Sequence, residues 1–258
     1  MLRLSELVKV CCGTVALLAF SSASFAEGGA VTANLSSGKN IFENGKADGS
    51  VAACSGCHGE KAMGQDAMGT PRLANIGYVY VVKQLNDFAS GKRVPPAGSL
   101  GEAMTGFAKA LSDQEKRDVA AYVNSLPKNN DLSDLKALKD EGTPVGEAYK
   151  GKIIVQYGIE GKVSACVSCH GYNGRGSDPV YPKIGEQKYV YLTAQLAHWR
   201  DGSRANDPMG QMRAVAKNLT DADINDIAAY LTQAPESSSG DGMDVNNQTV
   251  MEKVHIVK

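Results

Sequence analysis

The motif Cys-x-x-Cys-His occurs twice in this chain of 258 residues, at Cys54–His58 and again at Cys166–His170. Two cysteines three positions apart lie on the same side of one helical turn. The histidine that directly follows them extends from the adjacent position. Both copies keep all three residue types. The function of the motif in each half of the chain should therefore use two thiols and one imidazole together.

Several kinds of site use a Cys-x-x-Cys pair, but most do not need the histidine. A thioredoxin-type redox pair sits in a βαβ context, which this chain lacks. A zinc site needs four ligands, whereas each half offers two cysteines and one nearby histidine. A disulfide across three residues closes too small a loop to stabilise much. Covalent haem uses all three residues, because the thiols add to its vinyl groups and the imidazole ligates its iron.

We therefore predict two covalently bound haem c groups, each with its iron. The residues predicted to attach them are Cys54, Cys57, His58, Cys166, Cys169 and His170.

The first 26 residues have the features of an export signal. Arg3 and Lys9 are basic, residues 10–20 are apolar and uncharged, and Ser24 and Ala26 are the small residues that a signal peptidase requires. The uncharged stretch is marginal for a membrane span, and no later segment is apolar enough for one. We expect cleavage after Ala26, a periplasmic mature protein and no transmembrane segment after cleavage.

The rest of the chain is a tandem repeat. An offset of 111 residues superimposes Tyr78–Tyr80 on Tyr189–Tyr191 and Pro71 on Pro182. Apolar residues recur at helical spacing in both units, and no alternating run of useful length indicates a strand. We predict an all-α fold of two tandem domains. The expected segments are a signal peptide (1–26), domain 1 (27–128), a linker (129–146), domain 2 (147–235) and a flexible tail (236–258).

The last helix of each unit carries the same start signal. Ser112 with Glu115, and Thr220 with Asp223, have the spacing of capping boxes. The spacing predicts that each of these helices begins at the residue after its Ser or Thr.

A closed haem iron needs a sixth ligand, and histidine cannot supply it in both units. The only further histidines, His198 and His255, both lie in the second half. A methionine thioether is the alternative, and it raises the reduction potential. Met104 and Met212 each lie seven residues before the leucine that precedes the last helix of their unit. We therefore predict these two as ligands, with Met209 as the alternative for the second haem.

The order of these motifs resembles the cytochrome c4 family of di-haem electron carriers. The resemblance rests on Cys54–Gly59, Pro71–Leu73, Met104–Gly106, Leu111–Asp113 and Ala120–Tyr122, with counterparts at Cys166–Gly171, Pro182–Ile184, Met212, Leu219–Asp221 and Ala228–Tyr230. It implies two class I cytochrome c domains, each with one covalent haem.

The resemblance also implies specific contacts. The helix with Gly38 should cross the helix with Tyr122, and the helix with Gly151 should cross that with Tyr230. The carbonyl oxygens of Pro71 and Pro182 should accept hydrogen bonds from Nδ1 of His58 and His170, which would fix each imidazole and tune its basicity. The residues themselves, without the resemblance, give two expectations for Arg72 and Lys183, which follow the two prolines: they either pair with haem propionates or lie as solvated surface charges.

Charge and motifs together indicate an electron carrier. The 27 basic and 28 acidic residues give a net charge of −1, which does not fit a nucleic-acid binder. We expect a non-enzymatic protein that shuttles electrons between redox protein partners, from a respiratory donor to a terminal oxidase or another acceptor. The alternative is an electron-transfer subunit of a larger periplasmic dehydrogenase, for example in sulfur-compound oxidation. A di-haem peroxidase would need one open iron, and two matched methionines disfavour it.

Overall fold

The computed structural model describes residues 32–127 and 131–235. The expected signal peptide and tail lie outside these residues. All regular elements within them are helices, accompanied by isolated bridges such as Gln65 to Thr70, so the predicted all-α class is confirmed. No helix among the described residues is long and apolar enough to cross a membrane.

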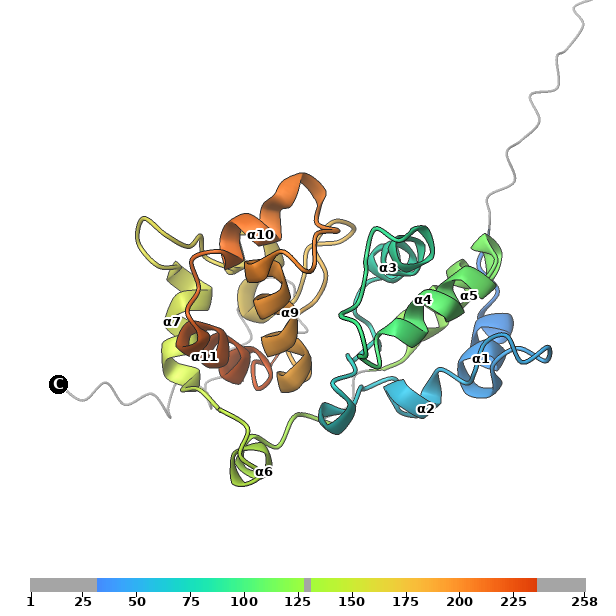
Figure 1. Cartoon of the computed structure of the whole chain (residues 1–258), viewed down its shortest axis with the longest axis horizontal. Coiled ribbons are helices and arrows are strands. Elements are labelled where there is room, and N and C mark those ends of the chain that lie inside the picture. Colours follow the sequence, from blue (N-terminus) through green and yellow to red (C-terminus); the bar gives the residue numbers. More distant parts are fainter. Residues whose placement is uncertain (1–31, 128–130, 236–258) are drawn as a thin grey trace, which may run out of the picture. The chain divides into compact units, whose positions relative to one another are not determined.

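The first repeat forms one hydrophobic core, centred on Phe42 and Val123. Its helix α1 packs against α5, and α3 packs against both α4 and α5 (Figure 1). The elements are α1 (Leu35–Asn44), α2 (Ser55–His58), η1 (Asp66–Met68), α3 (Tyr78–Ser90), α4 (Glu102–Ala110) and α5 (Asp113–Ser125).

The second repeat forms a separate core, centred on Val155 and Ile227. Helix α11 packs against α7 and α9, and α10 packs against α9 (Figure 1). The elements are α6 (Leu135–Asp140), α7 (Ala148–Tyr157), α8 (Val167–His170), η2 (Tyr172–Gly174), α9 (Tyr189–Asp201), η3 (Pro208–Gly210), α10 (Gln211–Ala216) and α11 (Asp221–Leu231). Only α6 belongs to the predicted linker.

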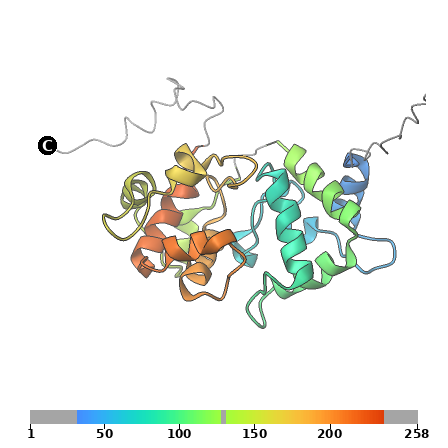
Figure 2. The same ribbon diagram turned by 90° about the horizontal axis from the view of Figure 1, so that it is seen from above.

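Two helices cross at a glycine in each repeat: α1 crosses α5, and α7 crosses α11. A Cβ atom at Gly38 would lie 2.1 Å from the carbonyl oxygen of Asp118, and one at Gly151 would lie 1.8 Å from that of Asp226. Any side chain at either position would therefore push the two backbones apart. The predicted crossings of α1 with α5 and of α7 with α11 are confirmed (Figure 2).

The same two aspartates also fix the ends of these helices. The Asp118 carboxylate accepts from the backbone N–H of Asn34 at 2.8 Å, and the Asp226 carboxylate accepts from that of Glu147 at 2.6 Å. Each accepting residue lies on the last helix, and each donor is the N-cap of the first. The last helices themselves begin at the predicted capping boxes, in which both reciprocal hydrogen bonds are present.

Hydrogen bonds also connect the two repeats. Arg204, which is buried, donates to the side-chain oxygen of Gln195 at 2.7 Å and to that of Gln84 at 3.1 Å. Arg93 donates to the same two glutamines, at 3.0 and 2.8 Å. Gln84 and Gln195 are 111 residues apart, and so are Arg93 and Arg204. Each repeat therefore contributes one glutamine and one arginine to this contact.

Candidate haem sites

The two Cys-x-x-Cys-His motifs form matching helical turns. Cys54 is the N-cap of α2 and is half-buried, whereas Cys57 is exposed; Cys166 and Cys169 repeat this pattern in α8. All four of these cysteines are free. Each turn therefore holds two free thiols three positions apart, and two thioether bonds to one haem need such a pair.

The electrostatics of the buried thiols argue against a thiolate site. Burial raises the pKa of Cys54 and of Cys166 to about 11. A raised pKa disfavours the thiolate that a redox-active cysteine pair uses. Within residues 32–127 and 131–235, no three His, Cys, Asp or Glu side chains come together to hold a metal ion.

Both motif histidines are buried, with one ring nitrogen engaged. His58 is 6% exposed and its Nδ1 lies 3.1 Å from the Pro71 carbonyl oxygen; His170 is 8% exposed and its Nδ1 lies 2.9 Å from that of Pro182. Burial lowers the pKa of both imidazoles, and the carbonyl contact only partly opposes it. Because a carbonyl can only accept, Nδ1 carries the proton and Nε2 keeps its lone pair for a metal.

The candidate methionines differ in how far they are buried. Met104 on α4 and Met212 on α10 are half-buried and pack against their respective cores. Met209 is 89% exposed and has a φ of 55° in η3. Met212, with Met209 as the alternative, stays the predicted ligand of the second haem.

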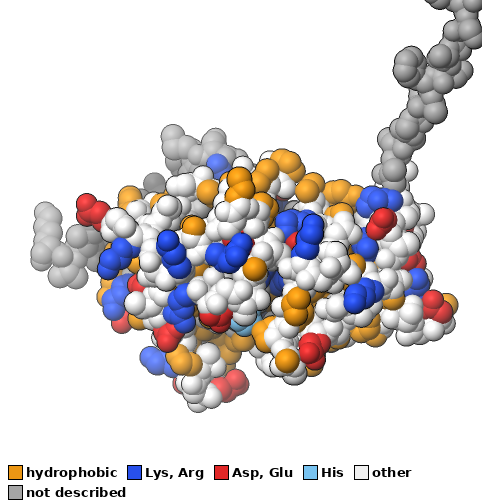
Figure 3. Space-filling model, turned by 45° about the horizontal axis from the view of Figure 1, so that its top comes forward, with side chains coloured by type: hydrophobic (Ala, Val, Ile, Leu, Met, Phe, Trp, Pro, Cys, Tyr) orange, Lys and Arg blue, Asp and Glu red, His pale blue; other side chains and the backbone are white. Residues whose placement is uncertain are grey.

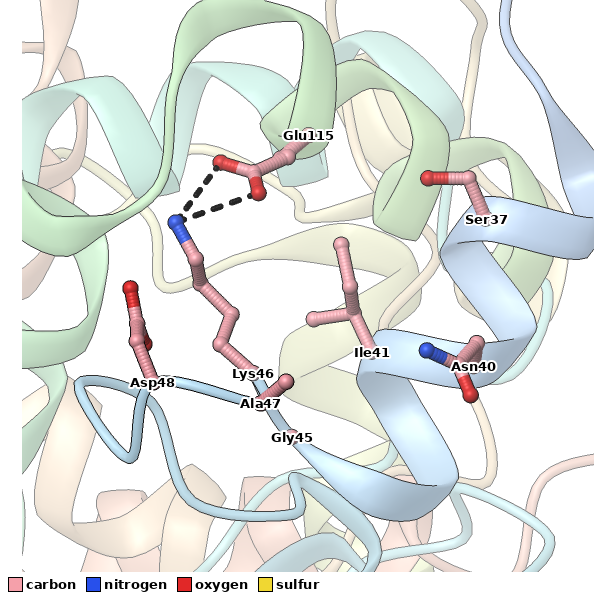
Figure 4. Close-up of a pocket in the computed structure, with 8 residues that line it drawn as sticks. All are labelled: Ser37, Asn40, Ile41, Gly45, Lys46, Ala47, Asp48 and Glu115. Carbon is pink, nitrogen blue, oxygen red and sulfur yellow. Dashed lines mark hydrogen bonds and ion pairs between the residues drawn. The ribbon is translucent and has the colours of Figure 1, made fainter.

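These donors fit haem c in both domains: a thiol pair, a neutral imidazole and a half-buried thioether. A hollow of about 390 Å³ beside α1 has no cysteine, histidine or methionine in its lining (Figure 4). It is lined by Ser37, Asn40, Ile41, Gly45, Lys46, Ala47, Asp48 and Glu115. Its Lys46 ammonium already donates to the Ala110 carbonyl and to the Glu115 carboxylate.

The basic residues after the two prolines bind across the repeats. Arg72 is fully buried and donates from Nη2 to the Gly185 carbonyl at 2.7 Å, so the expectation of a solvated surface charge is wrong for this residue. Lys183 donates from Nζ to the Asn75 side chain at 2.7 Å. Periodicity could not show this, because each contact spans more than 100 residues of sequence.

Comparisons with known proteins agree with this geometry. The cytochrome c family model matches residues 35–127 and 160–235. The chain is 34% identical to cytochrome c4 of Stutzerimonas stutzeri over 71% of its length and 85% of that protein. The solved structure of cytochrome c4 from Pseudomonas stutzeri is matched over its whole length and 79% of this chain, with 31% identity and a TM-score of 0.64. The chain is a di-haem cytochrome of the cytochrome c4 family.

As a member of this family, the cytochrome carries two covalently bound haem c groups, one in each class I domain, and transfers electrons. It is also 35% identical to the "Thiosulfate dehydrogenase electron acceptor" of Stutzerimonas stutzeri, over 81% of this chain and 91% of that protein. A thiosulfate dehydrogenase structure from Marichromatium purpuratum is matched with 31% identity and a TM-score of 0.70. That match covers 80% of this cytochrome but only 42% of the longer chain.

Proposed function

We propose that this cytochrome is a non-enzymatic periplasmic carrier whose irons are ligated by His58 with Met104 and by His170 with Met212. The observation that carries the proposal is the buried histidine beside each cysteine pair, whose Nδ1 lies within hydrogen-bond distance of a proline carbonyl oxygen and whose Nε2 can bind a metal. A half-buried methionine in each domain can complete the ligand set. An iron closed on both sides exchanges electrons without binding a substrate.

We further propose that the electron donor is a dehydrogenase that oxidises a sulfur compound such as thiosulfate. Support comes from the two relatives named as electron acceptors of thiosulfate dehydrogenase and from the longer solved chain. A dehydrogenase releases electrons in pairs, and two haems can take up one such pair. On the face drawn in Figure 3, basic, acidic and apolar side chains are interspersed, which suits brief contact with another protein.

The donor can be tested by rapid mixing. The oxidised cytochrome, a purified thiosulfate dehydrogenase and thiosulfate should together give fast reduction of both haems, whereas omission of the enzyme should leave them oxidised. Slow reduction in the presence of active dehydrogenase would instead favour a general respiratory donor. Absence of turnover with hydrogen peroxide in the half-reduced protein would exclude the di-haem peroxidase.

Haem attachment gives the most direct test of the sites. Mass spectrometry of the native protein should show the mass of two haems, and both should survive acid-acetone extraction because thioether bonds are covalent. Replacing Cys54 and Cys57 together by Ala should remove one haem mass. Replacing Cys166 and Cys169 should remove the other. Two haem masses in either double variant would contradict the assignment.

A further inference from the structure

One peptide group lies between each motif histidine and a hydrogen-bond acceptor in the other domain. The Pro71 carbonyl oxygen lies 3.1 Å from Nδ1 of His58, and the N–H of Arg72 belongs to the same peptide group. That N–H donates to Oε1 of Gln187 at 2.6 Å, in the second domain. We call this row of atoms, from His58 through the Pro71–Arg72 peptide to Gln187, the N-terminal bridge.

The second domain has a matching C-terminal bridge. His170 Nδ1 lies 2.9 Å from the Pro182 carbonyl oxygen, and the N–H of Lys183, in the same peptide group, donates to the Ile76 carbonyl oxygen at 3.1 Å. The two bridges differ in their last acceptor. It is a side-chain amide in the N-terminal bridge and a backbone carbonyl in the C-terminal one.

Gln187 is held in the orientation that the bridge requires. It is 1% exposed, its Oε1 also accepts from the N–H of Lys188 at 3.0 Å, and its Nε2 donates to the Arg72 carbonyl at 3.0 Å. These contacts place the oxygen, and not the nitrogen, against the Arg72 N–H. The side chain thus binds the backbone of Arg72 on both its donor and its acceptor.

The peptide of the N-terminal bridge has little room to move. A Cβ atom at Gly64, whose φ is +73°, would lie 2.5 Å from the Pro71 carbonyl carbon and 2.6 Å from the Arg72 nitrogen. The Gly64 N–H itself donates to the His58 carbonyl at 2.8 Å. The loop between histidine and proline therefore packs directly on this peptide group.

We propose that Gln187, in the second domain, is a positioning residue for His58 and so adjusts the reduction potential of the haem in the first domain. The proposal rests on the proposed role of His58 as an iron ligand. An acceptor on the N–H side of an amide polarises it, which makes its carbonyl a stronger acceptor. A stronger bond from Nδ1–H raises the basicity of the imidazole, which stabilises the ferric state and lowers the potential.

The test replaces Gln187 by Met in the haem-loaded protein, which keeps side-chain size but removes the acceptor. The Nδ1–H resonance of His58 in the reduced protein should move upfield, because its hydrogen bond weakens. In a redox titration that resolves the two haems by their methyl resonances, the first-domain haem should rise in potential and the second should stay unchanged. Gln187→Glu keeps an acceptor and adds negative charge, so it should move the first-domain haem in the opposite direction.

Ile76 provides the matched control, because it occupies the position of Gln187 in the first repeat. Its carbonyl, and not its side chain, ends the C-terminal bridge, so Ile76→Met should leave the potential of the His170 haem unchanged. Equal shifts at both haems in Gln187→Met, or no shift at either, would overturn the inference even though both haems are attached. If the ring resonances of His58 in the unsubstituted protein lack the large shift of an iron-bound imidazole, the proposed function itself is contradicted.

Discussion

Replacing Gly151 by Ala should lower the free energy of unfolding by about 3 kcal/mol, the upper part of the usual cost of overpacking. The added Cβ would lie 1.8 Å from the Asp226 carbonyl oxygen and 2.4 Å from its carbon, both of them backbone atoms of α11. Neither atom can move aside without separating α7 from α11, the helices that enclose the second core. Denaturant unfolding of the haem-loaded protein, followed by circular dichroism, measures the effect.

Gly106 serves as the control for this substitution. It lies in α4 without a positive φ, and a Cβ atom added there would meet no other atom within 4 Å. Gly106→Ala should therefore leave stability unchanged or raise it by up to about 1 kcal/mol, the difference in helix propensity. Equal stability of the two variants would mean that α7 and α11 do not cross in backbone contact.

Replacing Met212 by Ala should remove about half of the near-infrared absorption that methionine-ligated ferric haem shows. Met212 is half-buried and packs against the second core, and Ala has no atom that could bind iron in place of its thioether. The potential of the second haem should fall in parallel, because a thioether ligand raises it. Absorption of the fully oxidised protein and a redox titration measure both effects.

Met209→Ala is the matched control, three residues earlier in the same segment. Its side chain is 89% exposed, so its loss should leave the band intact. Met104→Ala should remove the other half, from the first haem. If Met209→Ala abolishes half of the band and Met212→Ala does not, the ligand assignment in the second domain is wrong.

Features that depend on short spacing along the chain could be predicted without a structure. The Cys-x-x-Cys-His turns, the helical class and the capping boxes each follow from residues within one or two turns of helix. The two helix crossings at Gly38 and Gly151 were implied by the resemblance to the cytochrome c4 family, and the structure contains both. The repeat also selected Met104 and Met212, whose ligand role stays a prediction.

The contacts between the two domains could not be predicted and are seen only in the folded chain. Nothing local distinguishes Arg72 from a surface charge, and its burial against Gly185 depends on a contact 113 residues away. Gln187 gave no sequence signal beyond a polar residue at the place where the first repeat has Ile76. Its partner is the backbone of Arg72, and every residue type except proline presents the same backbone donor and acceptor. A hydrogen bond to a distant main chain therefore leaves no pattern in the sequence, and only the folded arrangement of both repeats reveals it.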